Sequence, residues 1–93
     1  MRAYEAIFVF RPEDELFAKG KELVKTELDR VEAKIVKEDD MGSRELAYEV
    51  KKETRAHYYF YEAEIDPLKI DEMSKSIKLM EPVLKHLFIR KEQ

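Results

Sequence analysis

The sequence predicts an α+β domain in which a four-stranded antiparallel sheet carries two helices on one face. Short aromatic and β-branched runs indicate strands, and two stretches with apolar residues at helical spacing indicate helices. The predicted order is strand, helix, strand, strand, helix, strand. This is the split βαβ (βαββαβ), or ferredoxin-like, arrangement, whose right-handed crossovers place both helices on one side of the sheet. The opposite face is therefore expected to be open.

The first strand and the first helix follow one another at the start of the chain. Residues 4–10 are aromatic and β-branched and end at an Arg-Pro pair, which favours a strand over a helix of so few residues. Pro12 is tolerated in a first helical turn, and the carboxylates that follow it favour the positive end of the helix dipole. Apolar residues then recur at helical spacing, so an amphipathic helix is expected to about Glu32.

A long extended segment is expected in the middle of the chain. Residues 33–40 and 46–50 indicate one strand that is interrupted at Met41-Gly42-Ser43, where the glycine favours a bulge, a bend or a turn. Residues 51–56 are predicted to form a charged connection to the next strand.

The second half of the chain repeats the strand, helix, strand order. Residues 58–65 form a second aromatic strand, after which Asp66 can cap a helix and Pro67 can take its first position. That helix is expected to end near Glu81, because the following proline disfavours helix in the residue before it. Residues 84–90 are predicted to form the last strand.

Length and composition narrow the classes of function. A chain of 93 residues fits one domain, which we expect to span residues 1–93. The net charge of -3 argues against sequence-blind nucleic-acid binding by bulk positive charge, so any such contact must be local. The absence of cysteine excludes disulfides and thiolate catalysis and favours an intracellular protein. The N-terminus is predicted to be neither a signal peptide nor a membrane span.

Alternation within the strands divides their residues between two faces. The sets that contain Phe8 and Phe10, or Ala63 and Ile65, are the more continuously apolar and are assigned to the helix-facing core. The open face then carries four large side chains, which together with Phe88 form the predicted partner-binding set: Ile7, Val9, Tyr58, Phe60 and Phe88. Such a cluster indicates a protein partner or a stacked base. If the alternation is shifted by one residue, these side chains belong to the core instead.

Other motifs give weaker signals. Residues 55–61 loosely resemble the aromatic central strand of RNA-recognition motifs, but Ala56 stands at the glycine position. The acidic run at 38–40 lacks the spacing of a calcium loop and is interpreted as a solvated strand edge. His57 and His86 stand in no metal or nucleophile motif. No enzyme activity, metal, cofactor or small-molecule substrate is therefore predicted.

Three segments of the chain resemble bacterial small-subunit ribosomal protein six. These are Met1-Arg2-Ala3-Tyr4-Glu5, then Gly42-Ser43-Arg44-Glu45-Leu46-Ala47-Tyr48-Glu49-Val50-Lys51-Lys52, and residues 84–91. The middle segment is the most specific, because the family shows a Gly-x-Arg-x-Leu-Ala-Tyr-like stretch followed by an apolar residue and lysine. The similarity extends from Arg2 to Lys91. Departures are Glu49, where many members have proline, and Ala56, where many have glycine, and they put turn geometry in doubt.

The resemblance implies a structural constituent of the small ribosomal subunit, cytoplasmic and ribosome-bound. Members of that family bind the central domain of the small-subunit ribosomal RNA as a heterodimer with small-subunit ribosomal protein eighteen, with no known need for metal or cofactor. Arg2, Arg44 and Lys91 match basic positions of the family. With Arg90, they lie at strand ends or at the bend, where side chains could reach phosphates, and they are the predicted RNA-binding residues. The alternative is that they are ordinary solvated charges.

Two other classes of function stay open. The first is a small regulatory or ligand-binding ferredoxin-like domain that dimerises through its open sheet face. The second is a small-molecule enzyme on the same fold, acting for example on acyl phosphates. It would need an anion-binding loop after the first strand, where Glu13, Asp14 and Glu15 carry the wrong charge.

Overall fold

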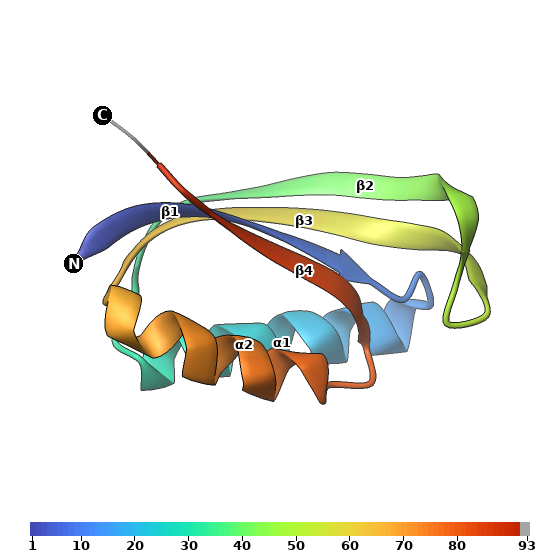
Figure 1. Cartoon of the computed structure of the whole chain (residues 1–93). Coiled ribbons are helices and arrows are strands. Elements are labelled where there is room, and N and C mark those ends of the chain that lie inside the picture. The colour runs from blue at the N-terminus through green and yellow to red at the C-terminus, as the bar shows by residue number, and fades with distance from the viewer. Residues whose placement is uncertain (92–93) are drawn as a thin grey trace.

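The computed structural model describes residues 1–91 and contains the predicted six main elements in the predicted order. The strands are β1 (Arg2–Phe10), β2 (Lys34–Val50), β3 (Glu53–Ile65) and β4 (Val83–Arg90), and the helices are α1 (Asp14–Arg30) and α2 (Ile70–Lys78). The sheet is antiparallel with the order β2-β3-β1-β4, and both helices lie on one side of it (Figure 1). The ferredoxin-like prediction is confirmed.

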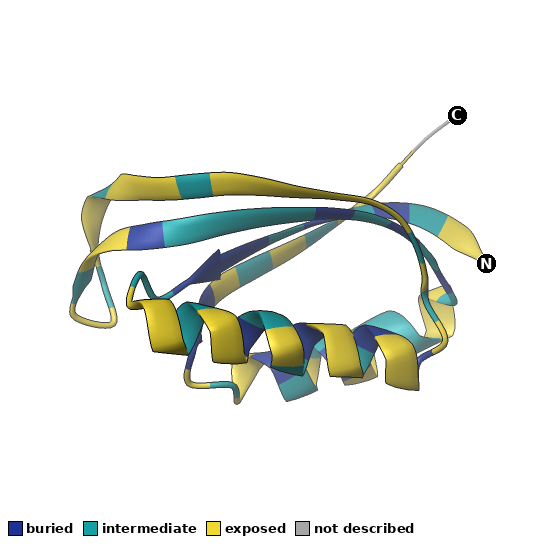
Figure 2. Ribbon diagram, turned by 180° about the vertical axis from the view of Figure 1, so that it is seen from behind, coloured by how far each residue is buried: buried dark blue, intermediate teal, exposed yellow. Residues whose placement is uncertain are grey.

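The main core lies between the sheet and the helices. Phe8, Phe10 and Ile65 are fully buried there, with Ala63 1% exposed, so the predicted division of the strands between two faces is confirmed. The helices contribute four buried apolar side chains to this layer: Val24, Leu28, Met73 and Ile77. Figure 2 shows the contrast along the sheet, with buried segments in β1 and β3 and mostly exposed residues along β2.

α1 packs very close to the end of β1. A Cβ on Gly20 would lie 2.5 Å from Cδ1 of Phe10 and 3.0 Å from Cβ of Pro82. Only a residue without a side chain therefore allows this approach. α1 starts at Asp14, two residues after the predicted proline, and ends at Arg30, because Glu32 adopts a left-handed φ of 59° just beyond it.

β2 is one long strand with the predicted irregularity at its glycine. Gly42 has a φ of 83°, and the pairing with β3 shifts register between Asp40 and Gly42. The Asp40 carboxylate accepts a hydrogen bond from the Gly42 amide at 2.9 Å. The predicted interruption is therefore a β-bulge, which bends the strand and increases its twist.

The connection from β2 to β3 is shorter than predicted. Instead of a charged loop over residues 51–56, β3 begins at Glu53, and the turn consists of Lys51 and Lys52. Both residues have positive φ, 48° and 68°, as a two-residue turn between twisted strands requires. Asparagine and glycine are the usual residues at such positions. Two lysines do not indicate a tight turn, so its position could not be predicted from the sequence.

The second helical segment begins as predicted and ends early. The Asp66 side chain accepts a hydrogen bond from the Leu68 amide at 3.0 Å, and Pro67 opens a short 3₁₀ turn, η1 (Pro67–Lys69), that leads into α2. α2 ends at Lys78, three residues before the predicted Glu81, and turn hydrogen bonds such as Met80 N–H to the Ile77 carbonyl follow it. Within residues 1–91, no helix combines the length and apolar character needed to span a membrane.

Candidate partner-binding face

The open face of the sheet carries residues in rows that cross its strands. In one row Ile7 of β1 lies between Phe60 of β3 and Leu87 of β4. We call these three residues the apolar row. Leu87 is 55% exposed, and Ile89, two residues further along β4, is 44% exposed. Figure 1 shows both helices on the opposite side of the sheet, so the apolar row and Ile89 present hydrophobic surface to solvent.

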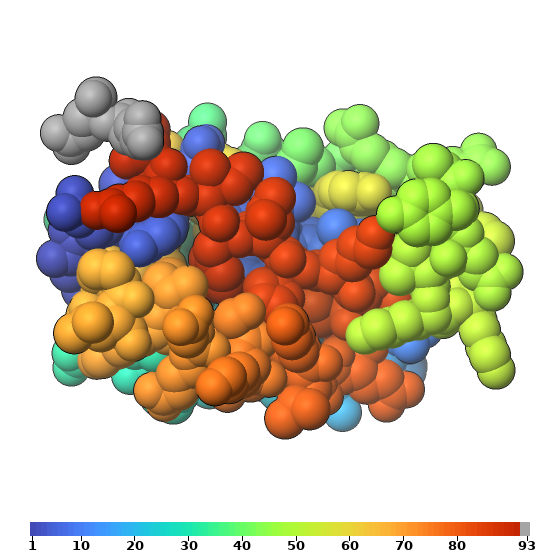
Figure 3. All heavy atoms as spheres, in the orientation of Figure 1, coloured from blue at the N-terminus to red at the C-terminus, as the bar shows by residue number. Residues whose placement is uncertain are grey.

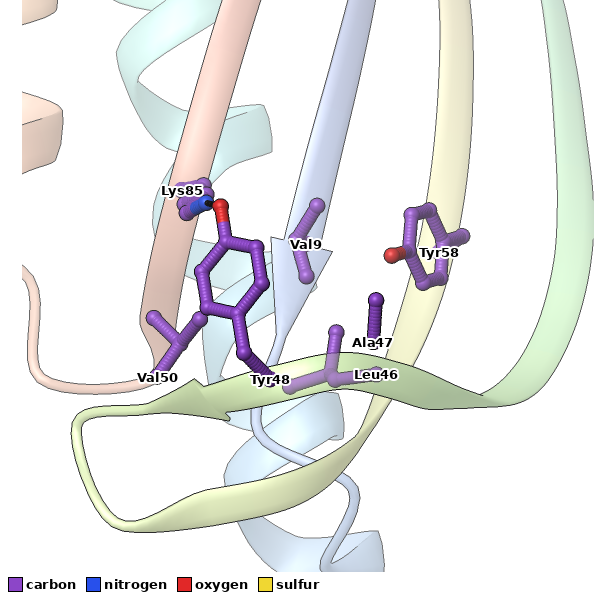
Figure 4. Close-up of a pocket in the computed structure, with 7 residues that line it drawn as sticks. All are labelled: Val9, Leu46, Ala47, Tyr48, Val50, Tyr58 and Lys85. Atoms are coloured by element: carbon purple, nitrogen blue, oxygen red, sulfur yellow. Dashed lines mark hydrogen bonds between the residues drawn. The ribbon is translucent and has the colours of Figure 1, made fainter.

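The next row is covered, which the sequence did not indicate. Val9 pairs with Tyr58 and with Lys85, but Val9 is only 9% exposed. It belongs to a second small cluster with Ala56 and Leu84, against which Leu46, Val50 and Tyr58 pack. The end of the β2–β3 hairpin therefore folds over this part of the open face (Figure 4).

A contact between Tyr48 and Lys85 joins the hairpin to the opposite edge of the sheet. The Lys85 ammonium donates to the Tyr48 hydroxyl at 3.0 Å and lies 4.9 Å from the centre of its ring. The hydrogen bond and the charge of Lys85 lower the pKa of Tyr48 below its ordinary value. Beneath this contact is a hollow of about 150 Å³, whose lining residues Figure 4 shows: Val9, Leu46, Ala47, Tyr48, Val50, Tyr58 and Lys85.

The structure corrects one residue of the predicted partner-binding set. Phe88 pairs with Ala6 and packs edge-to-face against Phe8, with ring centres 5.9 Å apart, so it belongs to the helix-facing layer. Its neighbours Leu87 and Ile89 occupy the open face instead. Applying to β4 the strict alternation already used for β1 and β3 would have identified them.

A pair of carboxylates borders the apolar row. Glu5 of β1 lies opposite Glu62 of β3, a placement of like charges that is unfavourable by itself. Lys91 offsets it by donating to the Glu62 carboxylate at 2.6 Å, and this hydrogen bond raises the pKa of Lys91. Lys91 therefore lies on the open face in an ion pair and is not an unpaired cation at a strand end.

The structure separates the predicted RNA-binding residues into two groups. Arg2 and Arg90 lie where β1 begins and β4 ends, whereas Arg44 lies beyond the bulge of β2. Arg2 pairs with Ile65 and Arg44 with Ala56, nine positions apart along β3, or about 30 Å at the rise of a strand. Within residues 1–91, none of these arginines forms an ion pair.

Both histidines are engaged in local contacts on the helix-facing side. The His57 ring stacks on Phe17 at 3.5 Å and meets the Asp40 carboxylate at 2.5 Å, and this bond lowers the pKa of Asp40. His86 is hydrogen-bonded to the Ser74 hydroxyl at 2.6 Å. Among the described residues, no three His, Cys, Asp or Glu side chains cluster in a way that could hold a metal ion.

Comparison with known proteins places this geometry in a family. The profile of the family described as Ribosomal protein S6 matches residues 3–90. The chain therefore belongs to the ribosomal protein S6 family. The small ribosomal subunit protein bS6 of Treponema pallidum is 38% identical over 90 residues, covering 97% of each chain. The bS6 protein of Treponema denticola is 38% identical over 92 residues, covering 99% of each. The family resemblance found in the sequence is confirmed.

Solved structures agree with the S6 assignment and show how widely the fold is used. The crystal structure of 30S ribosomal protein S6 from Thermotoga maritima has a TM-score of 0.86 and 28% identity, covering 97% of this chain and 87% of that one. The C-terminal domain of the MgtC protein from Mycobacterium tuberculosis has a TM-score of 0.66 at 8% identity, covering 100% and 90%. The second likeness reflects the fold alone, since one fold hosts many functions.

Proposed function

We propose that this S6-family protein binds the central domain of small-subunit ribosomal RNA together with small-subunit ribosomal protein eighteen, through two separate surfaces. The apolar row with Ile89 is the surface for the protein partner. Arg2, Arg44 and Arg90 are the contacts to RNA phosphates. The role is structural and not catalytic, and it places the protein on the ribosome in the cytoplasm.

The exposed apolar row is the observation that carries the proposal. Phe60, Ile7 and Leu87 lie side by side on three strands, on a face that the helices leave bare. Beside the row, Glu62 is paired with Lys91, but Glu5 forms no ion pair within residues 1–91, and its carboxylate suits a partner with basic residues. With a net charge of -3, this chain gains RNA affinity from a basic partner that brings positive charge of its own.

The unpaired arginines support the second surface. Within residues 1–91, Arg2, Arg44 and Arg90 are exposed and lack carboxylate partners, so their guanidinium groups are available to phosphate oxygens. Lys91 differs, because its ion pair with Glu62 must open before it can reach RNA. We therefore expect Lys91 to contribute less than the three arginines.

The test measures binding to central-domain ribosomal RNA with and without protein eighteen, across a series of salt concentrations. We expect tight binding only when both proteins are present, with a salt dependence that counts phosphate contacts. An Arg2→Gln/Arg90→Gln double variant should lower the affinity, whereas Lys19→Gln/Lys25→Gln, on the exposed side of α1, should not. Negligible binding with and without the partner would overturn the proposal.

Sedimentation of the free chain as a stable homodimer that buries the apolar row would favour a dimerising domain.

A further inference from the structure

A second hollow lies on the other side of β4, between the β2–β3 turn and the end of α2. It has a volume of about 280 Å³, and four of its lining residues are basic side chains from the β2–β3 turn, α2 and β4: Lys51, Lys78, Lys85 and His86. Val83 and Leu84 complete the lining. None of these residues is acidic, although the chain has more acidic than basic residues.

The three lysines of this hollow lack the partners that neutralise other cations of the protein. Arg11, Arg30 and Lys91 form ion pairs with glutamates. The ammonium groups of the hollow have only neutral partners: Lys51 donates to the Val83 carbonyl at 3.4 Å, and Lys85 donates to the Tyr48 hydroxyl. No ion pair to Lys78 occurs within residues 1–91. An ammonium has three donors, so each retains donors for a ligand.

Two of these lysines lower the pKa of a titratable neighbour. The pKa of His86 is lowered by its burial and then by the charge of Lys78. The pKa of Tyr48 is lowered by Lys85. Lys78 therefore acts on a group that lines the hollow, whereas Tyr48 is exposed and lies outside its lining.

We propose that this hollow binds one phosphate group of the RNA backbone, held by Lys51, Lys78 and Lys85. Lysine binds phosphate as a point charge, and three lysines around one concave site can share the oxygens of a single group. The volume is at the lower limit for small-molecule pockets and has room for a sugar-phosphate unit with water. The hairpin turn brings Lys51 to this place, and the Tyr48–Lys85 contact joins the hairpin to β4. Figure 3 shows the end of the hairpin, in yellow-green, against the orange-red atoms of β4. The inference rests on the proposed function for the source of the phosphate.

The first experiment compares two double variants of equal net charge. Lys51→Gln/Lys78→Gln removes two cations of the hollow, and Lys25→Gln/Lys75→Gln removes two exposed cations of the helices. In RNA binding with protein eighteen present, we expect the first variant to lose about tenfold in affinity and to reduce the magnitude of the salt slope by about 1. The Lys25→Gln/Lys75→Gln variant should have the RNA affinity and the salt slope of the wild type. Urea unfolding of both variants checks that a loss of binding does not reflect a loss of folded protein.

The second experiment uses inorganic phosphate and does not depend on the ribosomal role. Titration of the isotope-labelled chain with phosphate, against chloride at constant ionic strength, should shift amide signals around Lys51, Lys78 and residues 83–86 in the wild type only. If the wild type binds RNA but the two double variants have equal affinity and slope, the hollow is not a phosphate contact and the proposed function stands. If phosphate shifts these signals but RNA does not bind, the anion site stands and RNA as its source is wrong.

Discussion

Neighbouring residues of one strand point to opposite faces of the sheet and differ in how far they are buried. On β1, Phe8 points towards the helices and is fully buried, whereas Ile7 points away and lies in the apolar row. The helix-facing side is sealed by two helices, and the open face keeps Leu87 at 55% exposure. The comparison indicates that stability is concentrated on one face and partner binding on the other, so substitutions on the two faces should separate the two properties.

The largest effect is expected on the helix-facing side. Phe8→Ala removes a ring that contacts Phe10, Tyr61 and Phe88, with centres 5.7 to 6.0 Å apart. We expect the free energy of unfolding to fall by about 3–5 kcal/mol, because the cavity left in the core can collapse only in part. Equilibrium urea unfolding measures it. A loss below about 1 kcal/mol would show that the aromatic cluster is loosely packed and that the two faces differ less than their burial indicates.

The open face should show the reverse behaviour. Leu87→Asp places a charge in the apolar row and should leave the free energy of unfolding within about 0.5 kcal/mol of the wild type, since the side chain is already exposed. Affinity for protein eighteen should fall by at least about tenfold, or about 1.4 kcal/mol. Leu79→Asp is the matched control, because Leu79 is 87% exposed at the end of α2. Equal loss of partner affinity in both variants would contradict the assignment of the open face.

The main features of both faces could be predicted from the sequence because alternation in strands is a strong signal. It placed Phe8 and Ile65 in the core, and Ile7 and Phe60 opposite them. The cover over Val9 could not be predicted in this way. The cover depends on where the hairpin turns and on how far the Gly42 bulge bends β2. Lysine is not a typical residue of a two-residue turn, so Lys51 and Lys52 do not indicate the position of the turn.

The hollow of lysines was missed for a related reason. Lys51 and Lys78 are far apart in the sequence, and neither stands in a motif. Only the short turn and the early end of α2 bring them to one place. Of the predicted RNA-binding residues, Lys91 could not be recognised as paired, because its ion pair with Glu62 depends on the strand order, in which only β1 separates β3 from β4.

A smaller effect on stability is expected at the β2–β3 turn, which belongs to the hairpin that covers part of the open face. Lys52→Gly replaces a side chain at a φ of 68°, where glycine has no steric penalty. The free energy of unfolding should rise by about 0.5 kcal/mol, since the relief of strain exceeds the added entropy of the unfolded chain. Lys25→Gly in α1 is the control and should lower it by about 1 kcal/mol. Destabilisation by both variants in urea unfolding would mean that the Lys52 side chain stabilises the hairpin by contacts that outweigh its strain.

The smallest expected effect is a pH dependence of the free energy of unfolding that comes from His86 in the helix-facing layer. Burial lowers its pKa below the ordinary 6.5, so the unfolded chain binds more protons than the folded chain between the folded-state pKa and 6.5. The contribution of His86 to stability is therefore fully present above about pH 6.5 and is lost as the pH falls through the folded-state pKa.

The test measures the free energy of unfolding between pH 7.5 and pH 5. It should decrease as the pH is lowered, and the decrease should be smaller in His86→Gln than in the wild type. In Ser74→Ala the decrease should persist, because burial is the main cause of the shift. Identical pH profiles for the wild type and His86→Gln would show that the imidazole remains solvated, and that β4 is less firmly packed on the helices than its contacts with Phe8 and Ser74 indicate.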